Sequence, residues 1–137
     1  TVDALAPDRR GATVAFGRSW SSPDAAPMLL LAGIDGRGKL RWQRQDKLLH
    51  GAYPSAALAL GRGQFAVLTA GQRDKFDAGV WLLGYSGKGK LRWQAPLAAN
   101  ERPRCLLARG RKGLVVAGGN AAGGVGLSDG WWALLRL

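Results

Sequence analysis

The stretch Gly33–Gln43, which reads GIDGRGKLRWQ, returns 51 residues later as Gly84–Gln94, which reads GYSGKGKLRWQ. Eight of the eleven aligned positions are identical. In both copies the Lys-Leu-Arg-Trp segment alternates charged and apolar side chains, the period of a β-strand with one buried face. The glycines that precede it are typical of a tight turn between two strands. The sequence therefore contains a duplicated strand–turn–strand element.

Further apolar segments precede each copy of this element. An apolar strand is expected immediately before each copy, over 28–32 in the first and 80–83 in the second. A third copy of this strand is expected over 131–135, where Trp132 stands 51 residues after Trp81. Each of these three strands is expected to follow a pair of further strands joined by a basic glycine turn. The pairs are 3–6 with 13–16, 57–60 with 65–70, and 104–107 with 114–117. Nearly continuous apolar runs of this length are typical of strands buried between neighbouring sheets.

These segments predict an all-β chain, a β-propeller-type repeat in one domain over residues 1–137. Its three four-stranded units are expected at 1–45, 46–96 and 97–137, with eleven strands in total because the third unit lacks its fourth strand. Such a chain is a partial propeller or half of an assembled ring. The only helical turn that the sequence favours is a short one within Asp46–Tyr53.

The segment Trp81–Gln94 resembles bacterial β-propeller repeats whose blades read aromatic-Leu-hydrophobic, an Asp/Asn-Gly turn, and hydrophobic-x-Trp. The segment Gly113–Gly118 resembles the second strand of the same family, and quinoprotein-type repeats are similar in placing a Gly-Lys turn before a Trp. The resemblance implies blades of about 40–50 residues, usually about 4–8 to a ring. It implies no particular ligand, because such folds host many functions.

The chain is strongly basic, with a formal net charge of +11. This charge fits either a solvated basic surface or a site for a polyanion such as nucleic acid or acidic glycan. No apolar run reaches the length of a membrane span. The first residue is Thr1 rather than Met. Together with the resemblance to bacterial β-propeller repeats, this slightly favours a periplasmic or extracellular location.

No residues with catalytic spacing are found, so no catalytic residue, metal site or cofactor is predicted. His50 is the only histidine and Cys105 the only cysteine, which excludes a site built on several histidines or cysteines of one chain. Cys105 is expected in the core, in keeping with its apolar neighbours. Trp42, Trp93, Trp81 and Trp132 are expected to pack between sheets, whereas Trp20 lies in a polar loop and is expected to be exposed.

In four-stranded blades, the loop after the second strand and the connection to the next unit emerge at the same end. This geometry predicts one candidate ligand or partner surface, made of Arg18, Trp20, His50, Tyr53, Gln72, Arg73 and Asn120. The opposite end is expected to carry the basic turns that hold Arg9, Arg10, Arg37, Arg62, Lys88, Arg111 and Lys112.

Three functions remain open at this point. The first is a non-catalytic protein-interaction or regulatory module, part of a larger protein or assembly, whose propeller is completed by a protein partner or a second copy. The second is a polyanion-binding module that uses the basic turns. The third is the propeller portion of an enzyme whose catalytic groups lie on another chain or segment.

Overall fold

The computed structural model describes residues 1–73, 78–98, 101–109, 112–120 and 130–136. These residues form antiparallel strands and no helix, so the expected all-β class is confirmed. No apolar helix of membrane-spanning length occurs in this part of the chain. The strands are β1 Val2–Pro7, β2 Thr13–Ser19, β3 Met28–Ile34, β4 Leu40–Gly61, β5 Gln64–Gln72, β6 Ala78–Ser86, β7 Leu91–Ala98, β8 Glu101–Arg109, β9 Gly113–Asn120 and β10 Gly130–Arg136.

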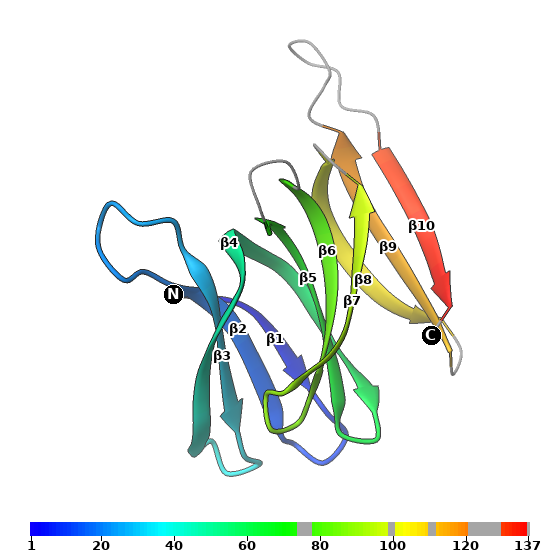
Figure 1. Cartoon of the computed structure of the whole chain (residues 1–137). Coiled ribbons are helices and arrows are strands. Elements are labelled where there is room, and N and C mark those ends of the chain that lie inside the picture. The colour runs from blue at the N-terminus through cyan, green and yellow to red at the C-terminus, as the bar shows by residue number, and fades with distance from the viewer. Residues whose placement is uncertain (74–77, 99–100, 110–111, 121–129, 137) are drawn as a thin grey trace.

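The strands follow one another in space as they do in sequence. A seven-stranded sheet has the order β1-β2-β3-β4-β5-β6-β7, and a second sheet has the order β10-β9-β8. Figure 1 shows three groups of strands side by side, with β8–β10 on one flank and β1–β3 on the other. We call them the first layer (β1–β3 and residues 40–46 of β4), the middle layer (residues 53–61 of β4 and β5–β7) and the third layer (β8–β10).

Strand β4 joins the first layer to the middle layer. Its first part pairs with β3 and its second part with β5, and His50 takes part in both pairings, opposite Met28 and Gln72. Gly51, with φ of +63°, lies beside this point, in a conformation that favours glycine. The strand rises through the first layer and descends through the middle one (Figure 1).

This course of β4 corrects three expectations. The helical turn within Asp46–Tyr53 is not formed, because the backbone there pairs with β3 and β5 and Ala52 N–H bonds the Pro27 carbonyl at 3.0 Å. His50 and Tyr53 consequently lie within a strand rather than in a loop. The expected fourth strand of one unit and first strand of the next are one continuous element.

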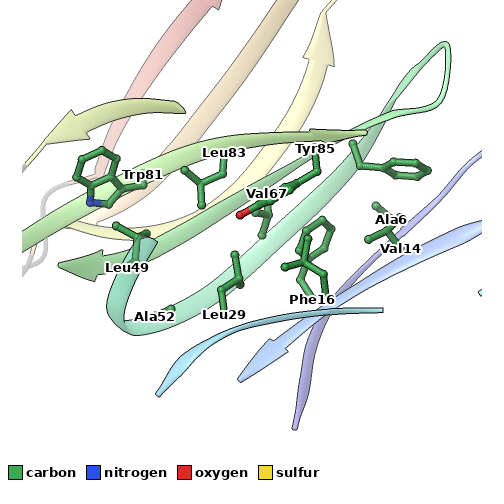
Figure 2. Close-up of a cluster of buried hydrophobic side chains, with 12 residues drawn as sticks. Ala6, Val14, Phe16, Leu29, Leu49, Ala52, Val67, Trp81, Leu83 and Tyr85 are labelled. Carbon is green, nitrogen blue, oxygen red and sulfur yellow. The ribbon is translucent and has the colours of Figure 1, made fainter. Parts of the chain in front are cut away.

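The apolar core fills the two spaces between the three layers. On β5, Phe65 and Val67 face the first layer, whereas Ala66 and Leu68 face the third, as the twofold period of a strand requires. Figure 2 shows the first of these clusters, in which Phe16 and Leu29 of the first layer meet Trp81, Leu83 and Tyr85 of β6. Strands β5 and β6 of the middle layer are therefore buried on both faces, which explains their continuous apolar runs.

Burial differs from expectation at several aromatic and sulfur-bearing side chains. Trp81 is buried, but Trp42 and Trp93 are only half-buried, because each lies at the edge of its cluster. The side chain of Trp132 lies outside the described residues. Cys105 is exposed rather than in the core, because Leu106, its neighbour on β8, takes the side that faces the middle layer.

Two turns have the same geometry. Asp35 and Lys39 bracket the β3–β4 turn, and Ser86 and Lys90 bracket the β6–β7 turn. In each, the first residue accepts side-chain hydrogen bonds from the N–H groups two and four positions later. After each turn one extra residue bulges out, and a glycine then pairs with a tryptophan, Gly33 with Trp42 and Gly84 with Trp93.

Candidate functional site

The end of the molecule opposite these turns carries the loop 20–27, which projects to the left in Figure 1, and the bend of β4, and we call it the loop end. Arg18 lies there, two residues before the loop, at the end of β2. Its guanidinium forms a fork with the Asp3 carboxylate, with Nε–Oδ2 and Nη2–Oδ1 distances of 2.9 Å each. A paired fork of this kind fixes the plane of the guanidinium as well as its position.

Two exposed aromatic rings contact the same guanidinium. Its Cζ atom lies 4.3 Å from the ring centroid of Tyr53 and 5.5 Å from that of Trp20. Both distances lie within the range of cation–π attraction. Tyr53 is 53% exposed and Trp20 is 42% exposed, so the rings keep much of their surface in solvent while Arg18 holds them in place. Arg18, Trp20 and Tyr53 are called the aromatic–arginine cluster below.

The charge of Arg18 is permanent. The hydrogen bond to Asp3 is the main cause that raises the pKa of Arg18 above its ordinary value. Burial opposes this effect, and the negative charge of Asp3 adds to it. A guanidinium with a raised pKa stays protonated at any physiological pH. The cluster is therefore suited to binding through stacking and charge, and not to acid–base catalysis.

The other predicted site residues are distributed around this cluster. His50 lies at the bend of β4 opposite Gln72, the last residue of β5. Arg73 follows directly and places its guanidinium 5.3 Å from the ring of Trp81. Asn120 ends β9 in the third layer, opposite Glu101, and its side chain lies outside the described part of the structure. The predicted set thus shares the loop end, but direct contact is observed for Arg18, Trp20 and Tyr53.

Asp3 is a member of this site that the sequence-based prediction missed. Strand β1 pairs with β2 so that Val2 lies opposite Gly17 and Ala4 lies opposite Phe16, which leaves Asp3 without a partner of its own on β2. That pairing is irregular between Val2 and Ala4, so spacing alone does not give the contact.

A second polar pair lies inside the protein. Tyr85 is almost completely buried, and its hydroxyl donates a hydrogen bond to Oδ2 of Asp46. Oδ1 of the same carboxylate accepts the N–H of Leu48 at 2.8 Å. Burial, followed by the bond to Asp46, raises the pKa of Tyr85 well above its ordinary value. Because Asp46 is occupied by these two donors, the pair has a structural role in tying β6 to β4.

Comparison with known proteins gives no assignment: the chain matches no family model and no curated protein sequence. Within the described residues, no group of three or more histidine, cysteine, aspartate or glutamate side chains is placed to hold a metal ion.

Proposed function

We propose that this chain is a non-catalytic protein-interaction or regulatory module of the β-propeller type, acting within a larger protein or assembly. The observation that carries this proposal is the aromatic–arginine cluster. Trp, Tyr and Arg are the residues that most often dominate the binding energy of protein interfaces. Here all three are gathered on one exposed surface.

The cluster is also organised in advance of binding. Asp3 holds the guanidinium of Arg18 from one side, and Arg18 contacts Trp20 and Tyr53. Ordering flexible side chains is one of the main costs of forming an interface. A cluster already ordered in the free protein avoids part of that cost. His50 and Gln72 would form the polar rim of the same surface.

The propeller component of the proposal is supported by the layers and by their outer faces. Strands β5 and β6 of the middle layer are buried on both sides, as strands of a blade within a ring are, whereas each flanking layer has exposed apolar side chains. Leu107 and Leu134, both paired with Val115, are 60% and 52% exposed on the third layer, and Leu5 is 56% exposed on the first. We propose that a further β unit, from a partner or from a second copy, covers these faces.

The test of the interaction surface compares three forms of the protein as baits in extracts of the cells that produce it. Trp20→Ala/Tyr53→Ala removes both rings, and Leu40→Ala, at an equally exposed residue at the other end, is the matched control. We expect that the wild type and the control retain partner proteins that the double variant does not retain. An identical retained set for all three forms would refute the proposed surface.

A further inference from the structure

A groove of about 700 Å³ lies at the other end of the strands, which we call the turn end. It is bounded by the β1–β2 turn on one side and the β4–β5 turn on the other (bottom of Figure 1). Arg9, Arg10 and Arg62 line it, and its apolar lining includes Leu60 and Ala108. We call it the basic groove.

One acid, Asp8, also lines the groove, and it is held by the turn to which it belongs. Oδ1 of Asp8 accepts the N–H groups of Arg10 and Ala12 at 2.8 and 3.0 Å. Oδ1 of Asp35 likewise accepts the N–H groups of its own turn, while Oδ2 pairs with Nε of Arg41 at 2.7 Å. Within the described part of the chain, Arg9, Arg10 and Arg62 form no ion pair, neither with Asp8 nor with Asp35.

Arg62 is placed in the groove against its conformational preference. The β4–β5 connection is a two-residue turn, Arg62-Gly63, in which both residues have positive φ, +53° and +70°. Asn-Gly is the favoured sequence for such a turn, since a long side chain at positive φ is strained. Arg62 is the one non-glycine residue with positive φ in the described structure. Strain of this kind is characteristic of positions kept for function.

The positive surface continues from the basic groove into the third layer. Ala108 lines the groove, and the next residue, Arg109, lines a second concavity of about 250 Å³ together with Lys112 and Arg136. The positive charge therefore crosses the turns of all three layers. A ligand that contacts the basic residues of all three layers must therefore be extended.

We propose that the basic groove binds an acidic peptide segment of a partner protein. Arginine forks match carboxylates in geometry and charge, and the apolar lining accepts the side chains that alternate with them. A single-stranded nucleic acid is disfavoured, because its readers stack bases on exposed aromatic rings. The exposed aromatic residues of the described structure, Trp20 and Tyr53, are at the loop end. This proposal is independent of the aromatic–arginine cluster.

The test measures fluorescence anisotropy of a labelled peptide that alternates Glu with Leu. The groove variant is Arg9→Gln/Arg10→Gln/Arg62→Asn, in which Asn suits the turn. The control variant, Arg37→Gln/Lys39→Gln/Lys88→Gln, removes three charges from the same end but outside the groove. We expect the groove variant to bind about tenfold more weakly or worse, and the control to change by less than about threefold. Thermal unfolding checks that both variants are folded.

Three results would overturn the proposal. One is equal weakening by the two variants, which would mean a diffuse attraction to charge. Another is the absence of saturable binding to the wild-type protein. The third is tighter binding of a DNA duplex or of heparin than of the peptide, with the same sensitivity to the groove variant, since the groove would then be a polyanion site. A Gln-for-Glu version of the peptide is expected not to bind.

Discussion

The indole Nε1 of Trp42 donates a hydrogen bond to the carbonyl oxygen of Gly87, 3.0 Å away and 45 residues later in the chain. The same ring covers Gly33 on the neighbouring strand, where an added Cβ would lie 2.2 Å from Nε1. It also reaches Gly89 of the β6–β7 turn. One side chain thus fastens the first layer to the turn of the middle layer, and glycine at each contact makes room for it.

We first predict that Trp42→Phe destabilises the protein more than Trp93→Phe. Both variants remove similar ring area over a paired glycine, but Trp42→Phe also removes the hydrogen bond to Gly87. The difference in the free energy of unfolding is expected to be about 0.5–1.5 kcal/mol. Urea denaturation followed by circular dichroism measures it. Equal losses would show that the bond to Gly87 adds nothing to stability.

The second prediction concerns Gly84, which lies under the ring of Trp93. A Cβ at this position would lie 2.1 Å from Cε2 of the indole, so Gly84→Ala should cost about 1–3 kcal/mol through overpacking. In a Trp93→Ala background the obstacle is gone and the same substitution should cost much less. A double-mutant cycle measures this coupling. Additive effects would contradict the observed ring position.

A third prediction follows from the raised pKa of Tyr85. The unfolded phenol titrates near pH 10, and the folded one above it, so the protonated phenol is favoured in the folded state. Its contribution to stability is complete below about pH 10 and is lost as the pH rises toward the folded pKa.

Tyr85→Phe should therefore be less stable at neutral pH, by about 1–2 kcal/mol, because Asp46 loses a donor. It should also lose less of its stability than wild type does between about pH 9 and 11, a range that brackets the ordinary pKa of a tyrosine. Denaturation midpoints measured across this range test the prediction. Parallel declines in the two proteins would assign the pH dependence to other groups.

The fourth prediction separates stability from binding at Arg62. Arg62→Asn relieves a strained turn and is expected to raise the free energy of unfolding by about 1 kcal/mol. Differential scanning calorimetry would detect the higher melting temperature. Lys88→Asn, at an exposed turn position without positive φ, is the control and should not be stabilising. A destabilised Arg62→Asn protein would mean that the arginine side chain supports the fold.

The sequence predicted the strands well where apolar runs or alternation marked them. Phe65–Ala70 lies within β5, and the Lys-Leu-Arg-Trp segments begin β4 and β7 as expected. It did not predict the bulges at Arg41 and Arg92, because a single extra residue leaves no compositional trace. Nor did it predict that β4 runs unbroken past Gly51, which depends on partners supplied by β3 and β5.

The candidate site was predictable to a similar degree. That Arg18, Trp20 and Tyr53 share one end followed from the alternation of strand direction. Their actual contact, and the part that Asp3 plays in it, depends on strand register and side-chain conformation. The exposure of Cys105 was missed because the sequence is apolar at Cys105, Leu106 and Leu107, whereas only Leu106 of these three is buried.

The bend of β4 also affects when the first layer can fold during synthesis of the chain. Phe16 and Leu31 belong to the first layer, but the side chains that cover them, Val67, Leu83 and Tyr85, come from the middle one. A chain that emerges from the ribosome from its N-terminus cannot complete the cover of Phe16 until β6, which carries Leu83 and Tyr85, has been synthesised. The first layer should therefore stay unfolded on the ribosome until Tyr85 is free of the exit tunnel, and both layers should then fold in a single step.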